Sequence, residues 1–391
     1  MNDKVQDVKG LRIGLLLRSD HAHHRQIALG AVEYHRANPS VQIIGENLLP
    51  LISWNHLADF QGDGLVAIAN SKNELDRLKS SGVPYVLAGS RFLRPSELVV
   101  CSDNLAIGKL AAEHLLSCGL KNFLYVGGRN WDDERLRFDG FQNCLAESGF
   151  ECESIELNEL DFPFAKPIFE LRDLELTGVH KAIKLSEEPI GLFCPNSFIA
   201  RAVMGTAISV GATIPDDVAV VAVNDDPLLC ETTDPPLSAI AQDSIGIGFF
   251  SMETLVAKLN GDNVGNRSLP PKRVSGRRSS DVLMVGNEFI ESALRFIRDN
   301  AHHEIEISQI AKRAGVSRRT LEKRFRETLD SSPHQELLRM RMELAKSLLV
   351  DSNISITQIA LRSGFGSSQV FSTVFKKQTG MTPSQYRSME Y

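Results

Sequence analysis

Several strands predicted in the first 280 residues end in polar side chains that could hold a small ligand. These strand-end residues are Arg18, Ser19, Asp20, Asp103, Asn196, Asn224 and Asp225. In parallel sheets, ligands bind beyond the carboxyl ends of the strands. Carboxylate, amide and hydroxyl groups gathered there would form hydrogen bonds with a polar molecule, so we expect a binding site at this edge.

The sequence gives little support for enzyme or metal chemistry. It has no GxSxG elbow, no nucleophile–base pair and no metal-binding set, so we expect no catalytic residue, metal or cofactor. The run HAHH at residues 21–24 lacks a nearby cysteine or carboxylate cluster. A solvated loop or a hydroxyl-binding histidine explains that run better than a metal site does.

A second kind of chemistry is indicated near the C-terminus, where one short unit occurs twice. QIAKRAGVSRRTLEKRF spans residues 309–325, and QIALRSGFGSSQVFSTVF spans residues 358–375. The first copy is expected to expose mainly charged side chains, at Arg318, Arg319, Glu322, Lys323 and Arg326. The second is expected to expose mainly neutral polar ones, at Ser368, Gln369, Ser372, Thr373 and Lys376. Arginine attracts phosphate and matches guanine, and glutamine matches adenine, so both faces suit duplex DNA.

The spacing of apolar and turn residues predicts a helix-turn-helix in each copy. In the first copy Gly315 can end one helix in a left-handed turn, and Ser317 can cap the next. The second copy repeats the pattern around Gly364. A long helix over residues 334–350 would fix the separation of the two units. A separation near one turn of B-DNA, roughly 34 Å, would place both second helices in successive major grooves. Two helical hairpins that only pack together are the alternative.

The first 280 residues alternate apolar runs with helical segments. LRIGLLL at 11–17 and VAVVAV at 218–223 are continuous apolar runs, typical of strands buried on both faces. This alternation predicts parallel sheets with helices on both faces, and about 270 residues suit two such sheets. The stretch 260–281 is rich in Gly, Pro, Asn and Ser and reads as a last strand followed by a linker, and the chain beyond it is predicted to be helical.

Length and charge agree with a soluble chain of two or three domains. The 391 residues carry a net charge of −6. Residues 282–391 hold 16 Lys+Arg and 12 Asp+Glu, a net +4, which leaves −10 on the preceding part. A basic segment on an acidic carrier is typical of a DNA-binding module, although a solvated face explains the charge equally well. No apolar run reaches the roughly 20 residues that span a bilayer. The N-terminus shows no secretory segment, and the six cysteines form no CxxC pair, so we expect a cytoplasmic protein without a membrane partner.

These motifs resemble two known families. Residues from about 287 to 387 resemble the DNA-binding domain of the arabinose-regulator (AraC/XylS) family. Its closing signature is visible as IALRSGFGSSQVFSTVFKKQTGMTPSQYR at 359–387. The first 280 residues resemble the effector core of lactose-repressor-type regulators, which is similar to periplasmic sugar-binding proteins. The chain departs from both patterns, because the first family usually carries a cupin and the second usually carries its DNA-binding domain at the N-terminus.

The resemblance implies a domain organisation. A two-lobed α/β effector core with parallel sheets would span residues 1–280, and an all-α DNA-binding domain with two helix-turn-helix motifs would span 281–391. The first lobe would take residues 9–121 and 243–264. The second lobe would take residues 122–242 and 265–280.

The resemblance also carries ligand-contacting positions onto this sequence. They are Asp103, Arg137, Asn196 and Asp225, and Asp20 joins them from the stretch that departs most from the family pattern. A guanidinium and carboxylates in one cleft suit a sugar, because they bracket vicinal hydroxyls with charge-assisted hydrogen bonds. Asp103 and Asp225 could instead cap helices or turns, and Arg137 could form a surface ion pair.

The function implied is a sugar-responsive, sequence-specific DNA-binding transcription regulator, an activator of a sugar catabolic operon. The effector would be a pentose such as xylose. Expected partners are double-stranded operator or promoter DNA, RNA polymerase and a second copy in a homodimer. The alternative is a repressor, or a regulator that responds to a different small polar ligand.

Overall fold

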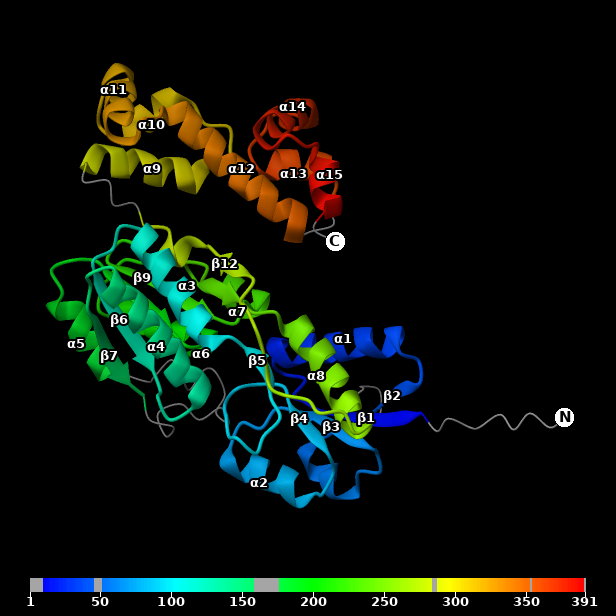
Figure 1. The fold of residues 1–391 in the computed structure, drawn as a ribbon. Helices are drawn as coiled ribbons and strands as arrows, with labels where there is room; N and C mark the ends of the chain where they lie inside the picture. Colours follow the sequence, from blue (N-terminus) through cyan, green and yellow to red (C-terminus); the bar gives the residue numbers. More distant parts are fainter. Residues whose placement is uncertain (1–9, 46–50, 158–175, 283–286, 352–353, 390–391) are drawn as a thin grey trace. The chain divides into compact units, whose positions relative to one another are not determined.

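The computed structural model describes residues 10–45, 51–157, 176–282, 287–351 and 354–389. The chain forms two compact units, residues 1–282 and 283–391 (Figure 1). The first unit combines parallel sheets with helices and the second is helical, which confirms the predicted fold class. No helix among these described residues is long and apolar enough to cross a membrane.

The first lobe of the α/β unit is built on parallel strands that end at one edge. A four-stranded sheet has the order β2-β1-β3-β4, and the pair β11-β5 extends it through an isolated bridge between Leu87 and Val99. The strands are β1 (Leu11–Leu16), β2 (Val41–Ile44), β3 (Gly64–Ala67), β4 (Tyr85–Leu87), β5 (Val100–Ser102) and β11 (Arg267–Leu269). The helices are α1 (Ala22–Ala37), α2 (Lys72–Ser80), α8 (Ser244–Leu259) and the 3₁₀ helix η1 (Trp54–Asp59).

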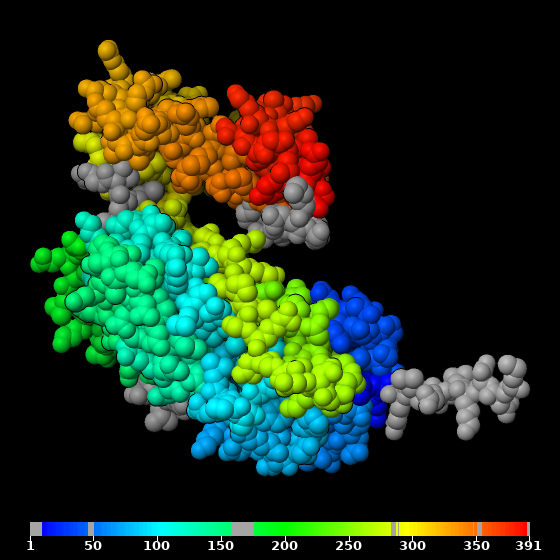
Figure 2. All heavy atoms as spheres, viewed as in Figure 1, coloured from blue at the N-terminus to red at the C-terminus, as the bar shows by residue number. Residues whose placement is uncertain are grey.

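Helices α1 and α8 are distant in sequence but pack together on this lobe. Their blue and yellow-green surfaces meet in Figure 2. Two glycines allow the close approach. A Cβ atom at Gly30 would collide with the carbonyl oxygen of Ile245, and one at Gly248 would collide with that of Ile27.

The second lobe has a six-stranded sheet of order β12-β10-β9-β8-β6-β7, in which only β12 is antiparallel to its neighbour. The strands are β6 (Asn122–Gly127), β7 (Cys152–Glu156), β8 (Ile190–Cys194), β9 (Val218–Val223), β10 (Ser238–Ala241) and β12 (Arg273–Ser275). The helices are α3 (Asn104–Ser117), α4 (Asp132–Glu147), α5 (Thr177–Leu185), α6 (Ser197–Ser209), α7 (Pro227–Glu231) and the 3₁₀ helix η3 (Arg278–Ser280).

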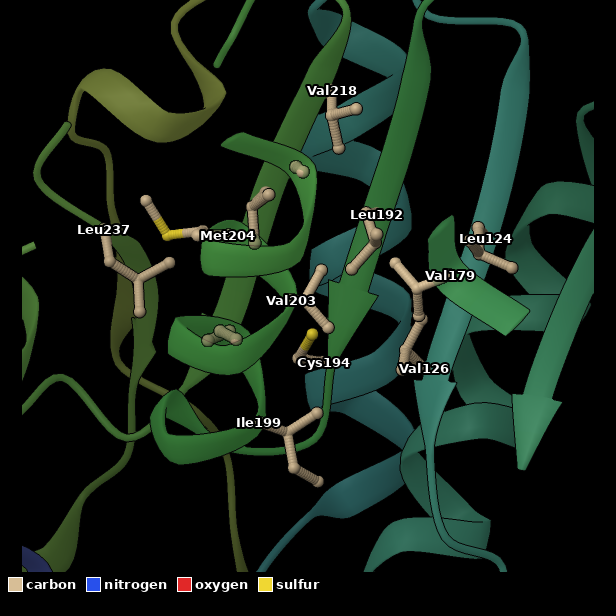
Figure 3. Packing of buried hydrophobic residues seen from close by; sticks show 14 of the residues in the cluster. Leu124, Val126, Val179, Leu192, Cys194, Ile199, Val203, Met204, Val218 and Leu237 are labelled. Atoms are coloured by element: carbon tan, nitrogen blue, oxygen red, sulfur yellow. The ribbon is translucent and has the colours of Figure 1, made fainter. Parts of the chain in front are cut away.

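The core of the second lobe lies on both faces of its sheet. On one face Leu192 and Val218 of the strands pack against Val203 and Met204 of α6 (Figure 3). On the other face α3 and α4 cover the sheet with a second apolar cluster. Every residue of β9 is buried, as the continuous apolar run of this strand predicts.

The chain crosses between the lobes after β5, after β10 and between β11 and β12. Residues 104–121 therefore lie in the second lobe rather than in the first, because α3 packs into the core that α4 shares. Residues 265–269 lie in the first lobe rather than in the second, because β11 pairs with β5. The sequence-based boundary kept α3 with the strand before it, whereas the chain crosses at the carboxyl end of that strand.

The second unit consists of two small helical cores joined by one long helix. Its helices are α9 (Glu288–Asn300), α10 (Ile307–Arg313), α11 (Arg318–Leu329), α12 (Pro333–Asp351), α13 (Ile356–Arg362), α14 (Ser368–Thr379) and α15 (Pro383–Met389). Leu321 and Phe325 of α11 are fully buried in the first core, and Phe371 and Phe375 of α14 in the second. Helix α12 contributes Leu337 to the first core and further side chains to the second.

Both predicted helix-turn-helix units are present. Gly315 and Gly364 adopt left-handed backbone angles, with φ of +70° and +78°. Ser317 caps α11 by accepting the backbone N–H of Thr320 at 3.1 Å. Glycine tolerates the left-handed turn and serine satisfies an unpaired N–H, so each residue has the role that its position predicts.

Arg341 on α12 ties the two cores together. Its Nε donates to the carbonyl oxygen of Ala301 at 2.9 Å, and its Nη2 donates to that of His303 at 2.8 Å. Gly364 lies against the same carbonyl, so that a Cβ there would collide with Ala301. The turn of the second helix-turn-helix is therefore held against the end of α9, which restricts the spacing of the two units.

Candidate functional site

A cavity of about 120 Å³ lies between the two lobes at the carboxyl ends of their strands. Residues at the ends of β3 and β4 and the last residue of β5, Ser102, line it from the first lobe, and residues after β8 and β9 line it from the second. Its polar lining residues are His21, His23, His24, Asn70, Ser90, Arg91, Ser102, Asp133, Glu134, Arg137, Asn196, Asn224 and Gln242. The cavity thus lies where the parallel sheets predict a ligand site.

Three histidines at the start of α1 line the first-lobe side. Nδ1 of His24 accepts the backbone N–H of Arg18 at 3.0 Å, so the neutral ring carries its proton on Nε2. Nδ1 of His23 lies 2.8 Å from Oγ of Ser244. Burial lowers the pKa of His23 to about 4 and that of His24 to about 2. Both imidazoles are therefore uncharged at neutral pH and act as hydrogen-bonding groups.

Arg137 is a buried cation of the second lobe, with 7% of its surface exposed. Its Nε donates to Oδ1 of Asn104 at 2.8 Å, and its Nη1 donates to the carbonyl oxygen of Pro195 at 2.5 Å. Asn104 is itself held by Oγ of Ser90, at 2.6 Å from its Nδ2. A guanidinium locked by such bonds keeps one orientation toward the cavity without a ligand.

Asn196 combines a structural bond with a place in the cavity lining. Its Oδ1 accepts the backbone N–H of Ile199 at 2.9 Å and so caps α6. This bond orients the amide, and the Nδ2 group keeps the capacity to donate to a ligand.

Two carboxyl groups at the start of α4 face these donors. Burial, assisted by the charge of Asp133, raises the pKa of Glu134 to about 7. Asp133 lies 4.0 Å from Nε of Arg91 across the lobe boundary. The cavity therefore contains acceptors and donors in comparable number, with opposite charges close together.

The lobes also contact each other beside the cavity. The backbone N–H of Leu93 and Nη1 of Arg94 reach Oδ2 of Asp132, at 2.9 and 3.2 Å. The guanidinium carbon of Arg91 lies over the Trp131 ring, 4.9 Å from the ring centre. These contacts join a first-lobe loop to the first turn of α4.

A chain of amide and hydroxyl bonds crosses the hinge at the base of the cavity. Ser102 donates to Oε1 of Gln242 at 2.6 Å, and Nε2 of Gln242 donates to Oδ1 of Asn224. Asn224 has a φ of +74°, which residues other than glycine rarely adopt. Such a conformation persists only where its surroundings hold it, and it is often found at functional sites.

The sequence-based ligand residues divide into two groups. Arg137 and Asn196 line the cavity, whereas Asp20, Asp103 and Asp225 do not. Asp20 pairs with Arg18 at 2.8 Å and is 61% exposed.

Asp103 and Asp225 are occupied elsewhere. Asp103 caps α3 by accepting the N–H of Ala106, so the alternative capping role applies. Asp225 pairs with Arg277 at 2.8 Å.

In each case a neighbour contributes instead. Successive side chains near a strand end point in different directions, and sequence alone does not fix which one faces the ligand. His21 after Asp20 and Asn224 before Asp225 line the cavity, whereas Asn104 after Asp103 acts indirectly, by accepting a hydrogen bond from Arg137.

In the helical unit, the predicted face of α11 is exposed at Arg318, Arg319, Glu322, Lys323 and Arg326. Arg318 is paired with Glu322 at 2.8 Å. Within the described part of the chain, Arg319 and Arg326 have no such partner. Their guanidinium groups are therefore available to phosphates or base edges without first breaking an ion pair.

The face of α14 is neutral and polar, apart from its lysines. Gln369, Thr373 and Lys376 are exposed, and Ser368 and Ser372 are half-buried. Val370 was missed by the sequence reasoning, yet 53% of this apolar residue is exposed in the first turn of α14. An exposed valine at the N-terminal end of a recognition helix suits contact with the methyl group of thymine.

Comparisons with known proteins agree with this architecture. Residues 112–280 match the periplasmic binding protein-like domain, and residues 310–389 match the helix-turn-helix domain. The chain is 27% identical to the xylose operon regulatory protein of Escherichia coli over 97% of both chains. It is 25% identical to that of Haemophilus influenzae, over 96% of this chain and 98% of the relative. The solved structure of the xylose-binding transcription activator xylR matches with a TM-score of 0.72 and 25% identity, covering 97% of this chain and 98% of that one.

These relatives are transcription regulators rather than enzymes, and the likeness extends over both units of the chain. A regulator of this kind needs a DNA-binding surface and a ligand cavity. The exposed basic face of α11 and the second helix-turn-helix suit the first role, and the cavity between the lobes suits the second. The chain therefore joins a C-terminal helix-turn-helix domain to a periplasmic-binding-protein-like core, and over both units it is similar to the AraC-type transcription regulators of xylose operons.

Proposed function

We propose that this chain is a sugar-responsive transcription activator whose effector is a pentose such as xylose, bound in the cavity between the lobes. The observation that carries the proposal is the lining of that cavity, where imidazoles, amides, two guanidinium groups and carboxyl groups meet at the strand ends. The xylose operon regulators that the chain resembles over nearly its whole length support the choice of sugar.

The lining suits hydroxyl groups, each of which donates and accepts a hydrogen bond. Nδ2 of Asn196 and the protonated Nε2 of His24 are donors, and the carboxylate of Asp133 is an acceptor. Asp133 and the ionised fraction of Glu134, whose pKa is about 7, offset most of the charge of Arg91 and Arg137, which favours an uncharged ligand.

The size of the cavity favours a monosaccharide. Its volume of about 120 Å³ is well below the roughly 300–1,000 Å³ of sites for drug-sized ligands. The apolar side chains of Phe92 and Phe198 also line it and offer contact to the C–H faces of a sugar ring.

The proposed action couples the two units. Ligand can shift the lobes toward closure only through a higher affinity for the closed form. We propose that lobe closure changes how the tandem helix-turn-helix units of a cytoplasmic homodimer bind promoter DNA. The DNA-bound homodimer then activates transcription by RNA polymerase. Arg319, Lys323 and Arg326 of α11 and Gln369 and Thr373 of α14 are the proposed DNA contacts.

The test measures the thermal midpoint of the full-length protein with D-xylose, L-arabinose, D-ribose and D-glucose. A sugar that binds only the folded state stabilises it by about 2.7 kcal/mol at 100 times its Kd. Asn196→Ser is the informative variant, because serine keeps the helix cap while the amide donor is lost. We expect about a 3- to 10-fold weaker Kd for this variant, the usual value of one neutral hydrogen bond. Asp20→Asn is the matched control and should bind as the wild type does.

Stabilisation by D-xylose alone supports the proposal in full. Stabilisation by another sugar or small polar molecule only would favour the alternative effector. The absence of a shift with every sugar would reject the sugar effector while leaving DNA binding intact.

A further inference from the structure

The segment that leads into the DNA-binding unit is fastened to the second lobe. Strand β12 pairs with β10, so that Ser275 lies opposite Ala239. Farther along, Oγ of Ser279 donates to the carbonyl oxygen of Val220 at 2.6 Å and accepts the backbone N–H of Ser238 at 2.8 Å. Ser279 is fully buried. The end of the first unit is therefore part of the second lobe, and movements of that lobe reach residue 282 directly.

Asp225 binds this segment at two points. One carboxylate oxygen lies 2.8 Å from Nη1 of Arg277, and the other accepts the hydroxyl of Ser275. Nε of Arg277 reaches Glu231 at 2.5 Å, and Nη1 donates to the carbonyl oxygen of Leu237 at 3.1 Å. The side chains of Asp225 and Arg277 are only 17% and 16% exposed, so solvent screens their attraction weakly.

The residue before Asp225 belongs to the cavity. Asn224 lines the cavity and accepts a hydrogen bond from Gln242, which lies where the chain crosses the hinge. Its left-handed backbone is a conformation that its surroundings must maintain. A ligand that competes for the amides of Asn224 and Gln242 therefore acts on the backbone that carries the carboxylate of Asp225.

We propose that the Asn224–Asp225 turn couples the cavity to the DNA-binding unit, with Asp225 as the positioning residue that holds the exit segment through Arg277 and Ser275. Where the signal is an effector sugar, this inference rests on the proposed function. Asp225 then affects the DNA response without touching the ligand, in contrast to the ligand contact that its sequence position predicts.

The first experiment uses the full-length protein and a duplex selected from random DNA by the wild type. Fluorescence anisotropy gives the ratio of DNA affinities with and without saturating D-xylose, for the wild type, Asp225→Ala, Asp225→Asn and Glu231→Gln. We expect a ratio of roughly 5- to 150-fold in the wild type, the usual range of allosteric coupling. The Asp225 variants should give a ratio within twofold of unity, while their affinity for D-xylose without DNA stays near the wild-type value.

Glu231→Gln is the matched control. It removes the other ion pair of Arg277, and Glu231, unlike Asp225, does not adjoin a cavity residue. It should retain the wild-type ratio. A purely structural ion pair would instead lower the midpoint of Asp225→Ala and leave its ratio unchanged, and that result would overturn the inference.

The second experiment needs no sugar. Coupling is reciprocal, so DNA binding should alter hydrogen exchange at the cavity amides near residues 222–226 and 240–243. We expect the change in the wild type and in Glu231→Gln, and its loss in Asp225→Ala. Equal exchange with and without DNA in the wild type, or a retained change in Asp225→Ala, overturns the inference. If D-xylose has no effect but DNA alters exchange as expected, the sugar assignment fails and the coupling stands.

Discussion

Replacing Arg319 by alanine tests whether α11 reads DNA sequence. Arg319 is exposed near the start of this helix, where recognition helices contact base edges, and within the described residues its guanidinium has no partner. A bidentate contact with guanine is worth about 1–3 kcal/mol, so Arg319→Ala should weaken binding to the selected duplex by roughly 5- to 150-fold. Because no ion pair within the protein is lost, the fold should keep its thermal midpoint.

Arg318→Ala provides the comparison. Arg318 is paired with Glu322, and an exposed pair of this spacing contributes only about 0.3–0.5 kcal/mol. If either arginine contacts only phosphate, its replacement by alanine should weaken binding to the selected and the scrambled duplex equally. It should also lower the salt dependence of binding by about one ion. Anisotropy titrations on both duplexes at several salt concentrations separate the two roles. Equal losses on both duplexes, or no loss at all, would refute base reading by Arg319.

Further predictions concern the second helix-turn-helix and the cavity. Val370→Ser should weaken binding by roughly 3- to 10-fold, and replacing thymine by deoxyuridine in the selected duplex should weaken the wild type but not this variant if the valine contacts a thymine methyl. Gly364→Ala should lower the free energy of unfolding by about 2 kcal/mol or more in urea titrations, because a left-handed backbone and a collision with Ala301 combine. Gly315→Ala, at the same place in the first repeat but in open space, should cost only about 1 kcal/mol, and equal costs would contradict the packing described. Burial lowers the pKa of His23 to about 4, so the unfolded chain binds more protons between about pH 6.5 and 4, and stability should fall as the pH falls through this window. Urea titrations at pH 7.5 and 5 should show a smaller fall in His23→Gln, and an equal fall would refute this assignment.

The helical unit was predictable because its signals are local. Gly315 and Ser317 mark a turn and a cap within a few residues, and the apolar spacing identifies Leu321 and Phe325 as inward-facing. The repeat of the same signals around Gly364 left little choice of structure.

The bracing by Arg341 was not predictable. It depends on carbonyl groups 38 and 40 residues away in sequence, which no local pattern reveals.

The ligand site was only partly predictable for the same reason. Parallel strands indicated the edge at which the cavity lies, but whether Asn224 or Asp225 lines it depends on a left-handed turn and on Arg277, which lies far along the chain. The sequence-based lobe boundary also placed α3 in the first lobe. Its packing against α4, which no local pattern reveals, places it in the second.

The histidines carried a usable signal. Three imidazoles at the start of a helix that follows a buried strand were identified as a hydroxyl-binding alternative. Their neutral state, however, depends on tertiary burial.

The most direct measurement is the affinity of the full-length protein for its selected duplex at fixed salt, with and without saturating D-xylose. A two-lobed sensor coupled to tandem helix-turn-helix units should change this affinity by at least about fivefold. Identical affinities, in a sample in which calorimetry shows the sugar bound, would contradict the coupling of cavity and DNA-binding unit.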